Sequence, residues 1–156
     1  MTGRPPLRQT VHATCVALAG RGVLLRGASG SGKSDLALRL MDAEGYGLGA
    51  APLRAELVAD DQVMVERVGE TLMASCPASI MNRMEIRGLG IVEVKAAEPV
   101  ALALVVDLVA GAAVERLPDD AASHTSLLGV SLPRLALDPF TASAPAKIRA
   151  ALSLRP

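Results

Sequence analysis

The segment from residue 23 to residue 41 constrains the fold of this chain more than any other. The apolar run at residues 23–25 leads directly into GASGSGKS, residues 27–34, and leucines and alanines at helical spacing follow. The loop fits the pattern G-x-x-x-x-G-K-[S/T], with a strand predicted before it and a helix after it. A strand, a glycine-rich turn and a helix in this order predict an α/β domain.

Each part of this loop has a physical task in binding phosphate. Glycines let backbone N–H groups turn toward one centre, where they bind an anion, and the following helix N-terminus adds positive partial charge. Lys33 supplies a full charge to the β- and γ-phosphates, and the Ser34 hydroxyl is a ligand for Mg²⁺. An ordinary turn before a helix is the alternative. We predict that a nucleotide or pyrophosphate is bound by Gly27, Ala28, Ser29, Gly30, Ser31, Gly32, Lys33 and Ser34.

A hairpin-rich α/β domain is predicted around this loop. The run at residues 100–109, VALALVVDLV, is the most apolar of the chain, and its valines favour a buried central strand. Ser143 followed by Pro145 predicts the start of a last helix. We predict a flexible segment at residues 1–10 and one domain with a mixed sheet at residues 11–156. Its other strand candidates are residues 11–18, 23–26, 56–59, 63–68, 71–75, 91–94 and 127–137, and residues 117–125 form a predicted loop.

The composition of the chain indicates which kinds of binding partner are not expected. The 156 residues carry 16 basic and 16 acidic side chains, one Tyr, one Phe and no Trp. Nucleic-acid-binding proteins usually show a basic excess and aromatic side chains for stacking, so no nucleic-acid partner is expected. No run of about 20 apolar residues occurs, and residues 1–9 lack the apolar stretch of a secretory signal. We therefore expect no membrane span and a cytoplasmic location.

Two acidic positions are candidates for holding a metal or activating a nucleophile. Asp107 lies near the end of the most apolar run and is similar to a Walker B aspartate, whereas Asp60 and Asp61 follow a weaker strand. Hydrophobicity alone favours Asp107. Two adjacent carboxylates can divide the work, because one can face a metal while the other accepts a proton. An exposed acidic turn also explains Asp60 and Asp61, so residue chemistry leaves these alternatives open.

A longer set of motifs resembles one family. The segment MEIRGLGIVEV, residues 84–94, is similar to the signature of the HPr kinase/phosphorylase family. Three shorter motifs precede this segment in that family's order and at similar spacing. They are VH at residues 11–12, GASGSGKS at residues 27–34 and LVADD at residues 57–61. The string EIRGLG is much more selective than the phosphate loop alone. The resemblance covers residues 11–109 firmly and the remainder loosely.

The resemblance implies a bifunctional enzyme. Members phosphorylate a serine of the small phosphocarrier protein HPr, using ATP or pyrophosphate with Mg²⁺. They also remove that phosphate by phosphorolysis, in which inorganic phosphate attacks and pyrophosphate leaves. The implied fold is a P-loop α/β domain with a mixed sheet, similar to phosphoenolpyruvate carboxykinase, and members are usually hexamers, so a homo-oligomer is expected.

Roles for individual residues follow from the resemblance by position. Asp61 is implied as the general base that deprotonates the acceptor serine and, in reverse, returns the proton to the serine oxygen. Asp60 is implied to assist at the metal, where Glu85 and Ser34 are the ligands. His12 matches the family's catalytic histidine, which helps to stabilise the phosphoryl charge.

Further residues match positions of the family pattern. Lys33 is catalytic by this resemblance, and Arg116 in VERLPDD, residues 114–120, matches a catalytic arginine. The resemblance leaves Asp107 as a structural residue of a strand. The loop implicated in both activities consists here of Glu85, Ile86, Arg87, Gly88, Leu89 and Gly90.

The chain departs from the family pattern in three places. Few residues precede His12, where typical members carry a further N-terminal domain. Ala28 stands where relatives often carry an acidic residue. Residues 135–149, LALDPFTASAPAKIR, lack the Pro-Val-Arg-Pro-Gly-Arg type of motif that is tied to dephosphorylation. Kinase activity is therefore expected more strongly than phosphorylase activity.

Two other functions fit parts of the pattern. A nucleotide-binding sensor or interaction module with little turnover would keep the phosphate loop and need no protein substrate. A small-molecule kinase would also use this loop, but such enzymes usually carry lid arginines and substrate-side insertions, for which a short chain has little room. Transfer of phosphate from ATP to a protein, to a small molecule or to nothing separates the three.

Overall fold

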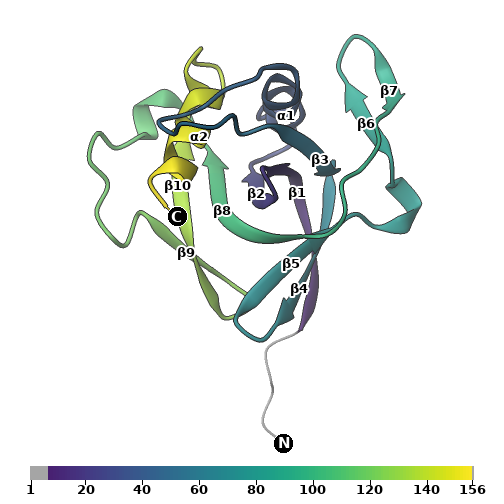
Figure 1. Cartoon of the computed structure of the whole chain (residues 1–156), viewed down its shortest axis with the longest axis horizontal. Helices are drawn as coiled ribbons and strands as arrows, with labels where there is room; N and C mark the ends of the chain where they lie inside the picture. Colours follow the sequence, from purple (N-terminus) through teal and green to yellow (C-terminus); the bar gives the residue numbers. More distant parts are fainter. Residues whose placement is uncertain (1–6, 156) are drawn as a thin grey trace, which may run out of the picture.

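The structure is a computed structural model that describes residues 7–155 (Figure 1). Strands form most of the regular structure, and the two α-helices lie at one end of the sheet. The elements are β1 Arg8–Leu18, β2 Arg21–Arg26, α1 Lys33–Asp42, β3 Ala55–Ala59, β4 Gln62–Val68, β5 Thr71–Ser75, β6 Arg83–Ile86, β7 Gly90–Glu93, β8 Val100–Leu108, β9 His124–Leu127, β10 Val130–Leu137 and α2 Ala144–Ser153.

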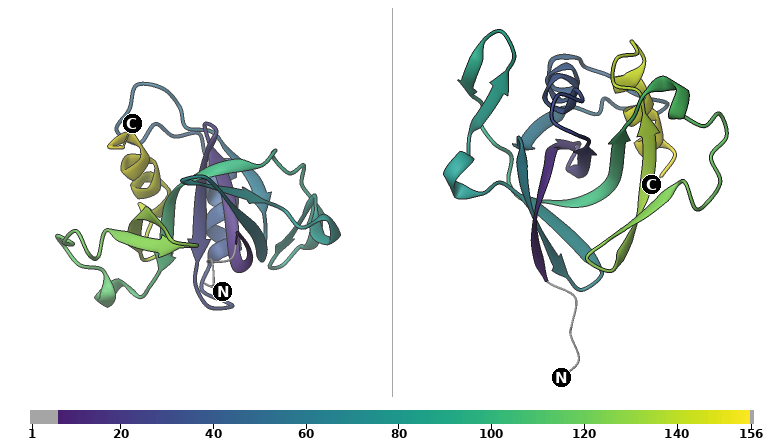
Figure 2. Two further views of the ribbon diagram at one scale, coloured as in Figure 1. Left: turned by 90° about the horizontal axis from the view of Figure 1, so that it is seen from below. Right: turned by 180° about the vertical axis from the view of Figure 1, so that it is seen from behind.

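The main sheet is mixed and returns on itself. Antiparallel pairing links β2 to β1, β1 to β4, β4 to β5 and β5 to β8, and parallel pairing of β8 with β2 closes the circuit. Strand β10 continues the sheet parallel to β8, with β9 at the edge, and β6 and β7 form a separate hairpin. Figure 1 and the right view of Figure 2 place α1, α2 and the β6–β7 hairpin at one end and the β4–β5 turn at the other. The predicted α/β fold with a mixed sheet is confirmed.

Strand β1 changes partners halfway along its length. Its first half pairs with β4 up to His12, which lies opposite Gln62. From Ala13 onward it pairs with β2, and Ala13 lies opposite Arg26, the last residue before the glycine-rich loop. This change of partner brings His12, the end of β2 and the start of β4 together, although they are distant in the sequence.

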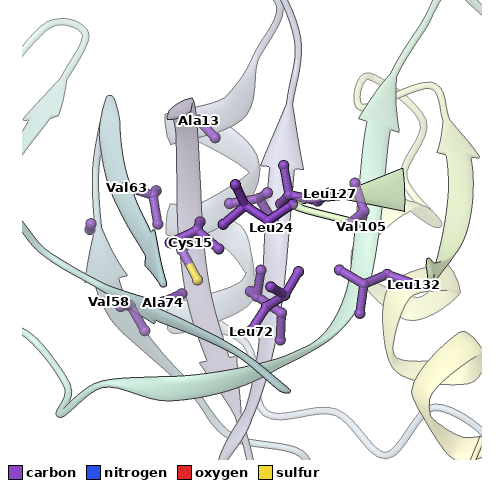
Figure 3. Packing of buried hydrophobic residues seen from close by; sticks show 14 of the residues in the cluster. Ala13, Cys15, Leu24, Val58, Val63, Leu72, Ala74, Val105, Leu127 and Leu132 are labelled. Atoms are coloured by element: carbon purple, nitrogen blue, oxygen red, sulfur yellow. The ribbon is translucent and has the colours of Figure 1, made fainter. Parts of the chain in front are cut away.

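The central strands are buried on both faces. Side chains alternate along a strand, so Ala13, Cys15 and Ala17 of β1 enter one apolar cluster, while Val16 and Leu18 enter the other. Figure 3 shows the first cluster, which is enclosed by strands of the main sheet. The second cluster packs the apolar faces of α1 and α2 against the sheet. Double-sided burial explains why β8 and β2 read as continuous apolar runs.

Several boundaries differ from the sequence prediction. Strand β1 begins at Arg8, because Arg8 to His12 pair with β4, so part of the segment predicted to be flexible belongs to the sheet, and residues 1–6 lie outside the described residues. The predicted strand at residues 127–137 is a hairpin, since Leu128 has a φ of 50° and Gly129 a φ of 79° and together they turn the chain. Its first strand, β9, therefore begins inside the predicted loop. In residues 7–155, no helix combines the length and apolar character needed to cross a membrane.

Candidate active site

The glycine-rich loop, residues 27–34, is the P-loop of this structure and connects β2 to α1. Gly30 and Gly32 have φ values of 81° and 101°, in the left-handed region that favours glycine. At Gly27 the limit is space, because a Cβ there would lie 2.4 Å from the Ser31 Oγ. Gly32 is the N-cap of α1, so the backbone N–H groups that begin this helix are directed toward the loop.

Lys33 is buried within the P-loop, with only 7% of its surface exposed. Its ammonium donates hydrogen bonds to the carbonyl oxygens of Gly27, at 2.7 Å, and Ala28, at 3.0 Å. Burial lowers the pKa of Lys33, and the negative charges of Asp61 and Asp60 partly oppose this shift. The lysine charge therefore lies between the phosphate-binding loop and the two carboxylates.

Asp60 is the buried centre of a hydrogen-bond network. Its Oδ1 accepts bonds from the Ser34 Oγ at 2.7 Å and from the Thr14 Oγ1 at 3.0 Å. Its Oδ2 accepts the backbone N–H of Glu85 at 3.1 Å. One carboxylate thus joins β1, the P-loop and strand β6 of the β6–β7 hairpin, and it fixes the position of the Ser34 hydroxyl.

Asp61 is oriented differently from its neighbour. Its φ of 70° is unusual for a residue other than glycine, although aspartate tolerates it better than most, and such conformations often occur at functional sites. The turn directs the side chain toward β1, where the Asp61 Oδ1 lies 3.0 Å from the His12 Nε2. The two side chains are 70% and 49% exposed, so both remain accessible to a substrate.

A cavity of about 630 Å³ brings most of the predicted site together. P-loop residues form one wall, the His12–Asp61 pair another, and the turn end of the β6–β7 hairpin a third. The predicted residues that line it are His12, Ser29, Gly30, Gly32, Lys33, Ser34, Asp61, Glu85, Ile86 and Arg87, and the lining residues that the sequence prediction missed are Thr14, Asp35, Leu38 and Phe140.

The missed residues carried different signals. Thr14 is two positions after His12 on the same strand, so alternation along β1 could have placed it on the same face. Phe140 carried no comparable signal, because it follows β10 and reaches the P-loop only through the tertiary structure.

Some predicted site residues lie outside this cavity. Gly88, Leu89 and Gly90 lie at the turn of the β6–β7 hairpin and do not line it, and Leu89 is exposed. Arg116 follows the 3₁₀ turn Gly111–Ala113 in an exposed loop. It lines neither this cavity nor a second cavity, of about 370 Å³, that Phe140 also lines. The structure therefore gives no support to the catalytic position expected for Arg116.

Asp107 is engaged elsewhere. Arg26 donates to both oxygens of its carboxylate, at 2.7 and 2.9 Å, and Arg134 donates to Oδ2 at 2.5 Å. Burial acts to raise the pKa of Asp107, but the bonds and charges of the two arginines outweigh it, and the pKa is lowered. Asp107 is thus a structural ion-pair residue, and the resemblance to a Walker B aspartate does not extend to its surroundings.

The oxygen atoms beside the P-loop suit a hard cation. Ser34 and Glu85 line the cavity, the buried Asp60 carboxylate is bonded to the Ser34 hydroxyl and to the Glu85 backbone N–H, and Mg²⁺ prefers oxygen ligands. Residues 7–155 contain no group of three or more His, Cys, Asp or Glu side chains arranged to hold a metal alone. Mg²⁺ usually takes one or two carboxylates and completes its coordination with phosphate and water, so the residues present fit this cation.

Curated proteins named HPr kinase/phosphorylase match much of the chain. The chain is 42% identical over 141 residues to the HPr kinase/phosphorylase of Chlorobium chlorochromatii, a match covering 83% of this chain and 39% of that protein. It is 47% identical over 92 residues to the HPr kinase/phosphorylase of Chlorobium luteolum, a match covering 58% of this chain and 25% of that protein. The chain thus spans about two-fifths or less of these curated relatives.

The structural comparison covers almost the whole chain. The solved structure of the Hpr(Ser) kinase/phosphatase from Coxiella burnetii superposes with a TM-score of 0.75 at 25% identity, covering 94% of this chain and 90% of that one. The family model of the HPr serine kinase C-terminal domain matches residues 6–148. A match of this extent over the P-loop, the acidic turn and the β6–β7 hairpin shows that the chain belongs to the HPr serine kinase C-terminal domain family.

Proposed function

We propose that the chain is the catalytic domain of a protein-serine kinase that transfers a phosphoryl group from ATP or pyrophosphate to an HPr-type phosphocarrier protein. One observation carries the proposal. Ser34, Asp61 and His12 line a single cavity, and buried Asp60 behind it accepts the hydrogen bond of the Ser34 hydroxyl, while Asp61 lies beside His12. The relatives named HPr kinase/phosphorylase support this acceptor and a reverse reaction with inorganic phosphate.

The donor phosphates would lie along the P-loop. Backbone N–H groups and the Lys33 ammonium supply the positive charge, and Lys33 would exchange its contacts with the Gly27 and Ala28 carbonyls for phosphate oxygens. Ser34, Asp60 and Glu85 would hold Mg²⁺. When bound, Mg²⁺ neutralises charge on the donor phosphates. Because Asp60 already fixes the Ser34 hydroxyl, this part of the site is preorganised.

Asp61 would move the proton of the acceptor serine. Its exposed carboxylate accepts the hydroxyl proton as the serine oxygen attacks, and the protonated group returns that proton when the phosphoryl group leaves in reverse. The His12 ring lies 3.0 Å from this carboxylate, so it orients Asp61 and can share its charge. The ring is also near enough to the cavity to stabilise phosphoryl charge.

The β6–β7 hairpin would receive the acceptor protein. The end of β6 contributes Glu85 and Ile86 to the cavity, and the turn that follows contributes Arg87 and carries exposed Leu89. The hairpin projects beside the P-loop end of the sheet (Figure 1). A protein serine could therefore approach Asp61 along this arm. A hexameric assembly, usual in the family, belongs to the same proposal and can be measured by light scattering.

Transfer of labelled phosphate tests the function directly. The purified chain is incubated with Mg²⁺ and γ-labelled ATP, with HPr and with HPr in which the acceptor serine is alanine. We expect label on HPr only, loss of transfer in EDTA, and release of pyrophosphate from phosphorylated HPr when inorganic phosphate is added. ATP binding without transfer to any HPr-type protein would show a nucleotide-dependent sensor instead, and label on a small molecule in a lysate would show a small-molecule kinase.

A further inference from the structure

Phe140 is an exposed aromatic residue at the edge of the P-loop. It is 74% exposed. This exposure is notable because the chain contains only one Phe, one Tyr and no Trp, so it has few aromatic side chains for its core. A Cβ on Gly32 would lie 3.5 Å from the Cε1 and Cζ atoms of the ring, so the ring lies against the loop backbone just before Lys33. An aromatic surface left open to solvent at this place is available to cover part of a bound ligand.

The turn that carries Phe140 is held in place by hydrogen bonds. The Phe140 backbone N–H donates to the Asp138 Oδ1 at 3.0 Å, and the Thr141 Oγ1 donates to the Asp138 carbonyl at 3.1 Å. Arg39 of α1 donates to the Pro139 carbonyl, which ties this turn to the helix that begins in the P-loop. An exposed side chain on a fixed turn needs little ordering when it binds, and this reduces the entropic cost of a contact.

A second cavity, of about 370 Å³, lies beside the same ring. Ser31 of the P-loop lies in its lining, so this cavity adjoins the phosphate-binding loop. Most of its other lining is apolar or backbone: Leu108, Val109, Ala110, Gly111, Pro139 and Phe140, with the Asp138 carboxylate at one side. Mostly apolar walls with a few polar groups are typical of sites for flat organic ligands such as nucleobases.

We propose that Phe140 and this second cavity receive the nucleoside of the phosphoryl donor, with the base stacked on the ring and the phosphates in the P-loop. The inference depends on the proposed nucleotide binding, which it makes more specific. Stacking accepts any base, because every base has a π-face. Phe140 therefore favours nucleoside triphosphates over inorganic pyrophosphate as donors, and it does not distinguish adenine from guanine.

Binding measurements on Phe140→Ala test this assignment. Calorimetric titration in Mg²⁺ would compare ATP, GTP and inorganic tripolyphosphate on the wild-type chain and on the variant. We expect ATP and GTP to bind roughly 5- to 150-fold more weakly to the variant, as for a lost base–aromatic contact, with less than about a twofold change for tripolyphosphate. Phe140→Tyr should bind ATP within about threefold of wild type, because it keeps the ring. Leu154→Ala is the matched control, since Leu154 is 72% exposed and lines neither cavity.

Each other outcome contradicts a different statement. Equal weakening of ATP and tripolyphosphate would show that Phe140 only supports the P-loop. Unchanged ATP binding with a raised KM for HPr would show that the ring contacts the acceptor protein. A wild-type chain that binds tripolyphosphate and ATP with the same affinity would overturn the nucleoside site and leave phosphate binding intact. A wild-type chain that binds neither would overturn the proposed function as well.

Discussion

Asp107 lies near the end of the apolar strand β8 and the Asp60–Asp61 pair follows β3, but the carboxylates meet different partners. The guanidinium groups of Arg26 and Arg134 bind both oxygens of Asp107. Asp60 accepts two hydroxyl groups and one backbone N–H, and Asp61 faces the cavity. One carboxylate is neutralised by arginine, whereas the other two remain near the P-loop with neutral or exchangeable partners.

The difference shows how the partner decides what a carboxylate can do. Two arginines lower the pKa of Asp107 and occupy its lone pairs, so it is poorly suited to accept a proton or hold a cation. The hydroxyl and amide partners of Asp60 leave its charge uncompensated, and the Lys33 ammonium, whose pKa the charges of Asp61 and Asp60 act to raise, is a counter-charge for it. Substitution of Asp60 or Asp61 should therefore affect catalysis, whereas substitution of Asp107 should affect the stability of the fold.

Asp61→Asn should have the largest effect. Removal of the proton acceptor should lower kcat about 10²- to 10⁴-fold, the usual contribution of a general base. The melting temperature should change little, because the side chain is exposed and asparagine tolerates a positive φ. Steady-state transfer to HPr measures kcat, and calorimetry measures the melting temperature. Full activity in this variant would falsify the assigned proton transfer.

Asp60→Asn should weaken the use of Mg²⁺. Asparagine has one acceptor oxygen, so if it accepts the Ser34 and Thr14 hydroxyl groups its amide nitrogen faces the Glu85 backbone N–H and cannot accept from it, and the network that fixes Ser34 is disturbed. We expect the Mg²⁺ concentration for half-maximal transfer to rise about 10- to 100-fold, the range seen when groups that orient metal ligands are changed. Ser34→Ala is the companion variant, and the two should not be additive because they act on one contact. Additive effects would argue against a shared role.

Asp107→Asn should destabilise the fold and spare the chemistry. It leaves Arg26 and Arg134 without their counter-charge, and we expect a loss of about 1–3 kcal/mol, below the value for fully buried pairs because these groups are partly exposed. Urea unfolding at pH 7 measures this loss, and kcat should stay within about threefold of wild type. A selective loss of kcat without a loss of stability would return Asp107 to the active site.

The same variant has a defined pH dependence. The folded pKa of Asp107 lies below its ordinary value of 3.8, so its stabilising contribution is complete above that value and is lost as the pH falls through the folded pKa. The stability difference between wild type and Asp107→Asn should be constant between about pH 5 and 7 and should shrink below about pH 4. Unfolding curves at several pH values measure the difference, and a difference that grows on acidification would contradict the ion-pair assignment.

Arg116→Ala should have the smallest effect. The side chain is in an exposed loop away from both cavities, so transfer by the chain should stay within about threefold of wild type and stability within about 0.5 kcal/mol. Lys147→Ala, at another exposed position, is the control for removal of a surface positive charge. A drop of 100-fold or more would show that Arg116 reaches the site in an arrangement different from the one described.

The local sequence pattern predicted many of the helices and strands. It was wrong where strand pairing decides the boundary of an element. The P-loop, helix α1, the apolar strand β8 and the start of helix α2 follow from spacing and from turn residues. Strand β1 begins earlier than predicted, because its polar first residues are fixed by pairing with β4 rather than by burial. The turn at Leu128 and Gly129 was missed, because a leucine with a positive φ is an uncommon turn residue.

The sequence by itself determined the phosphate-binding loop and, through its motifs, the family. A P-loop needs glycines, a lysine and a hydroxyl at fixed spacing, so it is visible within eight residues. The family resemblance favoured Asp60 and Asp61 over Asp107, but only the tertiary structure showed the partners of each carboxylate and that Phe140 lies beside the loop. Hydrophobicity along the chain reports burial of a strand, but the partner of a side chain at the end of that strand depends on which distant segments the sheet brings to the same place.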